Sequence, residues 1–126
     1  MKRLPFLFLI IATFAFRASN PGAMTFESVK HNFGMLHQGD IVSHEFTFTN
    51  TGDEPIIITD AEVTCHCTTV DFPKQPIMKG QKGTIKVTFD SKSAIDRQER
   101  TVLVKSNASN APVTLTFKAV VLKPKK

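Results

Sequence analysis

Hydrophobic and polar residues alternate through much of the chain, most clearly between Ile41 and Thr49. The even positions hold apolar residues and one histidine, and the odd positions after Ile41 are polar: Val42, His44, Phe46 and Phe48 against Ser43, Glu45, Thr47 and Thr49. A period of two is typical of a β-strand that buries one face. We therefore expect a half-buried strand here, with His44 on its inward face.

This strand is predicted to end at a turn motif that contains Asn50 and Gly52. Asn and Gly tolerate positive φ, and Pro55 cannot join a central ladder because it lacks a backbone N–H. A second strand is expected over residues 56–67, which would carry a Cys-x-Cys motif at the far end of a hairpin or corner.

Further strands are predicted wherever short alternating segments lie between clusters of Gly, Pro, Asn and Asp, at residues 24–29, 30–36, 84–90, 100–105 and 113–121. The polar stretch at 91–99 has too few apolar residues to bury a helix. About seven short strands without a helix longer than one turn favour an all-β fold, an immunoglobulin-like antiparallel β-sandwich. A small closed barrel is the alternative.

The first 23 residues have the pattern of a secretory signal peptide. A basic start is followed by an apolar run over residues 4–16 that is too short to span a bilayer comfortably. Cleavage is expected after Ala18, Ser19 or Ala23, and an uncleaved membrane anchor is the alternative. The predicted organisation is a signal peptide at 1–23, one immunoglobulin-like domain at 24–122 and a basic tail at 123–126. The protein is thus expected to be exported, with membrane contact only through the signal peptide.

Charge and composition narrow the possible partners. The formal charge of +5 falls to +2 without Lys2, Arg3 and Arg17 of the signal peptide, and the tail holds three more lysines. The body of the domain is therefore nearly neutral and has no basic stripe for nucleic acid. The chain has eleven Phe but no Trp or Tyr, which argues against carbohydrate binding by aromatic stacking.

Five motifs occur in a set order: Phe33-Gly34, Phe46-Thr47-Phe48-Thr49-Asn50-Thr51-Gly52, Cys65-x-Cys67-Thr68, Pro76-Ile77-x-x-Gly80 and Ile85-x-Val87-x-Phe89. Together they resemble a bacterial exported family, domain of unknown function fifteen-seventy-three, which is similar to the ASH, Hydin and major sperm protein domains. The resemblance covers about residues 25–121. It implies an immunoglobulin-like sandwich in a Gram-negative-type envelope, periplasmic or extracellular, and supplies no reaction or ligand. His66 and Lys79 stand where the family usually has Gly and Pro.

The Cys65-His66-Cys67 motif is the one candidate for chemistry. In an extended strand the two cysteines would share a face about 6.6 Å apart, near the upper limit for a disulfide, and so short a loop would stabilise the fold by only ~1.5 kcal/mol. Two thiolates with an imidazole would instead suit copper(I) or zinc, with His66 or the inward-facing His44 as a further ligand. His31 and His37 are expected in turns. The third alternative is that both cysteines pack as small hydrophobic residues.

No arrangement of residues predicts an enzyme. The carboxylate pairs lie in a turn or on one outer strand face, and no serine has the setting of a nucleophile. The leading hypothesis is a non-catalytic, exported module that is structural or binds an envelope protein, through a sheet edge or an end loop. The alternative is a metal-binding or thiol-redox protein that uses Cys65, Cys67 and a histidine.

Overall fold

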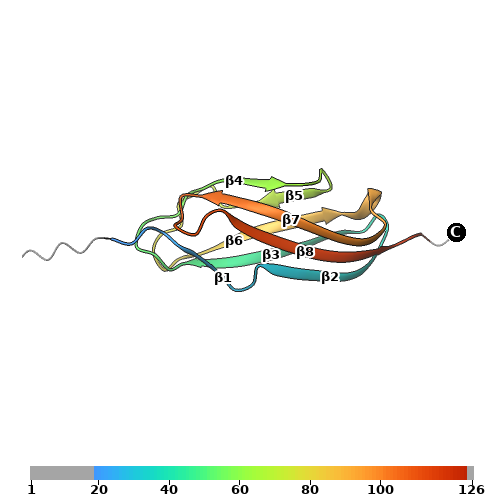
Figure 1. Ribbon diagram of the computed structural model, residues 1–126, viewed down its shortest axis with the longest axis horizontal. Coiled ribbons are helices and arrows are strands. Elements are labelled where there is room, and N and C mark those ends of the chain that lie inside the picture. The colour runs from blue at the N-terminus through green and yellow to red at the C-terminus, as the bar shows by residue number, and fades with distance from the viewer. Residues whose placement is uncertain (1–18, 125–126) are drawn as a thin grey trace, which may run out of the picture.

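The computed structural model describes residues 19–124, which form two packed four-stranded sheets (Figure 1). The predicted signal peptide up to Ala18 and the last two lysines lie outside the described residues. The strands are β1 (Met24–Phe26), β2 (Lys30–His37), β3 (Ile41–Asn50), β4 (Ile58–Val63), β5 (Thr68–Asp71), β6 (Lys82–Asp90), β7 (Asp96–Ser106) and β8 (Val113–Leu122). One short 3₁₀ turn, η1 (Ser91–Ser93), joins β6 to β7.

The strand order is β1-β3-β6-β5 in one sheet and β2-β8-β7-β4 in the other. This arrangement confirms the predicted all-β, immunoglobulin-like sandwich. It differs in detail, because there are eight described strands and β2 pairs with β8 in parallel. No helix in the described part of the chain is long and apolar enough to cross a membrane.

Alternating side chains from the two sheets form one core. Along β3 the even positions are buried or half-buried, as their pattern predicted, and Phe46 and Phe48 are almost fully inaccessible. β6 and β8 alternate in the same way. The largest buried side chains come from both sheets and from the loop before β4: Phe46, Phe48, Ile56, Ile85, Phe89, Leu115 and Phe117.

The chain crosses from one sheet to the other between β1 and β2. β1 pairs only with the last three residues of β3, Phe48 to Asn50. The next strand, β2, runs beside β8 in the opposite sheet, with an irregularity at Gly34, whose φ is +76°. Gly adopts this backbone conformation without strain. As a result, the first half of β3 lies at the edge of its sheet.

Asn50 holds the turn between β3 and β4 through its side chain. Its amide nitrogen donates to the carbonyl oxygens of Glu54 (2.8 Å) and Ile77 (2.9 Å). Its amide oxygen accepts from the backbone N–H of Gly52 (3.0 Å) and Ala23 (3.3 Å). Asn50 is only 1% exposed, and its bonds to Ile77 and Gly52 are buried.

The expected turn is present, but Gly52 is required there for a different physical reason than the one predicted. Gly52 does not adopt a positive φ; instead, a Cβ at this position would collide with the carbonyl oxygen of Pro21. Gly52 is therefore needed because the N-terminal segment lies directly against the turn, and Asn50 because its amide satisfies four backbone groups.

Replacing Asn50 by Ala is expected to lower the free energy of unfolding by about 3 kcal/mol, because buried backbone groups lose their partners. The isosteric Asn50→Asp variant should be destabilised as well, since carbonyl oxygens would then face a carboxylate. Urea unfolding followed by circular dichroism measures both, with exposed Thr51→Ala as the control. A loss below about 0.5 kcal/mol, the range of ordinary surface changes, would contradict this role.

Candidate functional site

The first half of β3 presents unpaired backbone groups along the edge of its sheet. In an antiparallel pair, successive residues point their N–H and C=O groups alternately to the two neighbouring strands. Glu27 donates its N–H to the carbonyl of Thr47 (3.0 Å), so the odd residues of β3 face the side of β1. Ser43 and Glu45 face the same side beyond the end of β1, and no described residue bonds to their backbone there. We call these residues the β3 edge.

The other sheet edges are short or irregular. β1 has three residues and β5 four, and β5 leads into a loop with two prolines. β2 and β4 each contain a register irregularity, and β4 also carries exposed Asp60 and Glu62. Short strands, irregularities and edge charges all limit pairing with another chain. Among the sheet edges of the described strands, the β3 edge has the most regular backbone, because β3 is continuously paired with β6 on its other side.

Four aromatic rings close the gap between β3 and β2. The rings of His31 and His44 stack with centroids 3.6 Å apart and planes at 8°. Phe33 packs edge-on against His31 (4.6 Å), and Phe46 packs edge-on against His44 (4.8 Å). This column of Phe33, His31, His44 and Phe46 joins the two sheets directly behind the β3 edge.

The column corrects one expectation and extends another. His44 lies on the inward face of β3, as predicted, and is half-buried. His31 falls within the strand predicted over residues 30–36, and that strand is confirmed rather than the turn also expected for this histidine: it lies in β2 and faces inward beside Phe33. The alternation of His31 and Phe33 was visible in the sequence, whereas their pairing with β3 depends on the crossing between the sheets. His37 is the exposed last residue of β2.

Burial and the neighbouring His44 both lower the pKa of His31 below its ordinary value of 6.5, burial being the larger cause. The folded state therefore binds a proton at this ring less readily than the unfolded state does. Its contribution to stability is complete above pH 6.5 and is lost as the pH falls below that value.

We expect the protein to be less stable at about pH 5.5 than at about pH 7.5, and this difference to shrink in the His31→Phe variant, which has no proton to bind at this position. Chemical unfolding at several pH values measures the effect. The pKa of Asp53 is also lowered, mainly by the N–H of Asn20 and then by Lys79, but from 3.8, so it titrates below this window. An unchanged pH dependence in His31→Phe would contradict this assignment.

The cysteine motif lies in a turn between β4 and β5 rather than in the extended strand that was expected. β4 ends at Val63, and Thr68 donates its N–H to the carbonyl of Cys65 (3.1 Å), which closes the turn. The turn brings the two Cα atoms to 5.2 Å, and the structure joins Cys65 and Cys67 by a disulfide. The N–H of Cys67 donates to the sulfur of Cys65 (3.2 Å).

The surroundings of this disulfide are polar outside and apolar inside. Cys67 packs against the core, whereas His66 is exposed. The two cysteines and His66 line a hollow of about 440 Å³ with Asp90, Lys92 and Ser93. His44 lies elsewhere, because β6 separates β3 from β5 and the register sets His44 level with Val70. In the described residues, no group of three or more His, Cys, Asp or Glu side chains is arranged to hold a metal ion.

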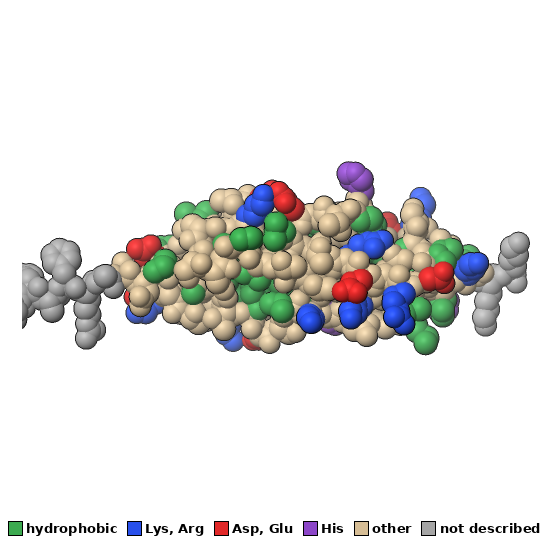
Figure 2. Space-filling model, in the orientation of Figure 1, with side chains coloured by type: hydrophobic (Ala, Val, Ile, Leu, Met, Phe, Trp, Pro, Cys, Tyr) green, Lys and Arg blue, Asp and Glu red, His purple; other side chains and the backbone are tan. Residues whose placement is uncertain are grey.

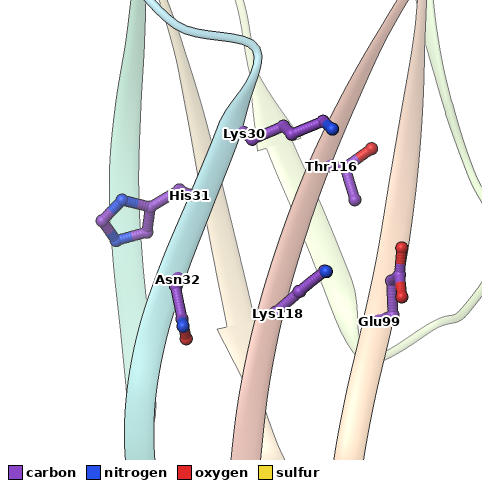
Figure 3. A pocket seen from close by; sticks show the side chains of 6 residues that line it. All are labelled: Lys30, His31, Asn32, Glu99, Thr116 and Lys118. Atoms are coloured by element: carbon purple, nitrogen blue, oxygen red, sulfur yellow. The ribbon is translucent and has the colours of Figure 1, made fainter.

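The outer face of the second sheet has a polar hollow of about 530 Å³ (Figure 3). Lys30, Thr116, Lys118 and Glu99 extend over β2, β8 and β7, and His31 extends away from them. Lys118 and Glu99 are paired in register across two strands. The view in Figure 2 likewise shows charges of both signs spread between small apolar groups. Neither surface has the concentrated charge of a nucleic-acid site.

Comparison with known proteins confirms the family and the fold. The family model "Protein of unknown function (DUF1573)" matches residues 24–121. A protein of unknown function from Porphyromonas gingivalis W83 has a TM-score of 0.72 at 18% identity over 84% of this chain and 50% of its own. The ASH/PapD-like domain 7 of human CEP192 has a TM-score of 0.65 at 8% identity, covering 88% of this chain and 93% of that domain. No curated protein matches the chain.

Other similar structures come from larger secreted or chaperone systems. The chaperone–tip adhesin subunit complex CsuC–CsuE of Acinetobacter baumannii gives a TM-score of 0.54 at 12% identity, over 79% of this chain and 52% of the matched one. The chain spans 24% of the secreted serine protease VesC and 31% of the VesB protease, both of Vibrio cholerae, which are also similar. At such low identity these matches show the fold and carry no activity over.

Proposed function

Because the chain belongs to the family Protein of unknown function (DUF1573) and folds as an immunoglobulin-like sandwich with an open sheet edge, we propose that it is a non-catalytic, protein-binding module of the cell envelope. It binds an extended segment of a partner protein, which adds a strand to the sheet at the β3 edge. The family resemblance and the sequence pattern of residues 1–18 support export.

The observation that carries this proposal is the unpaired backbone of Ser43 and Glu45. A partner strand running antiparallel to β3 would occupy the line that β1 leaves at Phe26. Main-chain hydrogen bonds to the two residues would supply affinity, and the side chains at alternate positions would supply specificity. Glu45 and its cross-strand neighbour Lys86 lie exposed on the outer face, so both charges are available to a partner.

The exposed side chains beside the edge suit a contact surface. Ile41 is 66% exposed at the start of β3. Met35 is 77% exposed at the far end of β2. Exposure of such large apolar groups to water is unfavourable, and a partner that covers them lowers the free energy. The PapD-like fold that the chain shares with a pilus chaperone is compatible with this mode of binding.

Ser43→Pro is expected to abolish partner binding, because proline removes the N–H that the added strand requires. The N–H of Ser43 faces away from β6, so the β3–β6 ladder keeps its bonds. Ser43→Ala is the matched control, since it removes the hydroxyl and keeps the N–H. The measurement is crosslinking of tagged protein in its native envelope, followed by identification of the attached protein.

The proposal requires one crosslinked partner that is kept in Ser43→Ala and lost in Ser43→Pro, with unfolding free energies of both variants within about 1–2 kcal/mol of the unchanged protein. Recovery of the protein only as a monomer, with no crosslinked partner, would contradict the proposal. Equal recovery of the partner with both variants would show that the partner binds somewhere other than the β3 edge.

The hydrogen bonds of the N-terminal segment indicate where the exported protein begins. Asn20 accepts the N–H groups of Asp53 (3.1 Å) and Glu54 (3.2 Å) at its carbonyl. The carbonyl of Gly22 accepts the N–H of Ser109 (2.7 Å), and that of Ala23 accepts the N–H of Thr51 (3.0 Å). Gly22 is itself buried. Of the three cleavage positions, those after Ala18 and Ser19 keep these bonds, and the one after Ala23 removes them.

We therefore expect the exported protein to retain residues 20–23. Intact mass spectrometry of protein taken from the envelope measures its N-terminus. A start at Ser19 or Asn20 is the predicted result, and a start at Met24 would contradict the segment's place in the fold. An uncleaved chain would contradict the predicted processing, but it would not bear on the proposed binding at the β3 edge. A recombinant chain that begins at Met24 should unfold at a lower urea concentration than one that begins at Ser19.

A further inference from the structure

The Cys65–Cys67 disulfide is not what holds its turn together. The bond of Thr68 N–H to the carbonyl of Cys65 closes the turn, and the N–H of Asp90 donates to the carbonyl of Cys67 (2.9 Å), which fixes the turn to β6. Both bonds are between backbone atoms and do not involve sulfur. The disulfide spans a sequence separation of two, so it restricts the unfolded chain very little. Its presence therefore calls for a role other than stapling the fold.

The turn offers hydrogen-bond and charge stabilisation to one of its sulfurs. The N–H of Cys67 already points at the sulfur of Cys65 from 3.2 Å. A backbone N–H in this position stabilises a thiolate more than a thiol, because hydrogen bonds to a charged acceptor are stronger. Among the described residues, the sulfur of Cys67 has one hydrogen-bond partner, the hydroxyl of Thr68 at 3.7 Å.

Arg100 supplies a positive charge near the end of β4. β4 pairs with β7 as far as Val63 and Val102, and Arg100 lies two residues before Val102 on β7. Arg100 lies on the inward face of β7, between Gln98 and Val102. Its terminal nitrogens donate to the side chain of Gln98 and to the carbonyl of Glu99 (3.2 Å). Its Nε is buried and has no partner among the described residues.

We propose that the Cys65–Cys67 turn is a thiol–disulfide exchange site for cysteine thiols of exported proteins. A partner thiolate attacks the sulfur of Cys67, and a new sulfur–sulfur bond forms there. The Cys65–Cys67 bond breaks, and its electron pair leaves on Cys65, whose thiolate accepts the N–H of Cys67 and is stabilised by the charge of Arg100.

A second thiolate of the partner completes the exchange. It attacks the partner sulfur of the mixed disulfide, forms the partner's own disulfide and releases Cys67 as a thiolate. The partner dithiol is oxidised by two electrons, Cys65 and Cys67 are reduced, and they take up the two protons that the partner thiols lost. The reverse sequence, with a partner disulfide, restores the site. This activity is independent of strand addition at the β3 edge.

Two thiol probes test the two steps on the folded protein. Reduced glutathione, followed by acid quenching and peptide mapping, is expected to attach to Cys67 and leave Cys65 as a free thiol. A peptide with two cysteines is expected to be oxidised in proportion to the reduced protein formed. Glutathione attached at Cys65, or exchange only after the protein is denatured, would overturn the proposal.

Variants of β7 test the part played by Arg100. Arg100→Gln is expected to slow the glutathione step several-fold, because loss of the charge raises the pKa of the leaving thiol and a thiol of higher pKa leaves more slowly. Arg100→Lys should restore much of the rate because it restores the charge. Arg97→Gln is the matched control, since Arg97 is an exposed arginine on the opposite face of β7. Equal rates in Arg100→Gln and Arg97→Gln would show that Arg100 takes no part in the exchange.

Discussion

The crossing of the chain between β1 and β2 determines where this domain has an open sheet edge. β1 pairs with only three residues of β3 before the chain passes to the other sheet and joins β8. An immunoglobulin-like sandwich needs such a crossing when its first segment contributes to both sheets. The cost is an uncovered length of β3, and the column of Phe33, His31, His44 and Phe46 shields the core behind it. An open edge with a closed core is a stable arrangement that still offers a place for another strand.

The other end of the sandwich is tied together by polar contacts. Asn50 satisfies backbone groups of the β3–β4 turn, of the N-terminal segment and of the loop before β6. Gly52 leaves room for Pro21. Asn110 holds both the N–H and the carbonyl of Met24, at 3.0 and 2.8 Å. These contacts fix where β1 begins, so the length of β1 and the extent of the β3 edge follow from them.

Local pattern predicts the strands whose two faces differ in polarity. β3, β6 and β8 alternate strictly and could be read from the sequence. β5 and the first residues of β7 could not, because they are mostly polar: Gln98 and Arg100 face inward on β7 and bond to each other. The cysteine motif was assigned to a strand because nothing in the sequence marks where β4 ends. The parallel pairing of β2 and β8, and with it the β3 edge and the contact of His31 with His44, arises from tertiary packing, which the alternation of one segment does not encode.

Amide hydrogen exchange of the ¹⁵N-labelled domain tests the open edge most directly. The N–H groups of Ser43 and Glu45 should exchange at the rate of unpaired backbone, while those of Phe46 and Phe48, which face β6, should be strongly protected. Addition of the crosslinked partner should then protect Ser43 and Glu45. Strong protection of these two amides in the isolated domain would mean that the edge is already covered and would contradict the proposed binding surface.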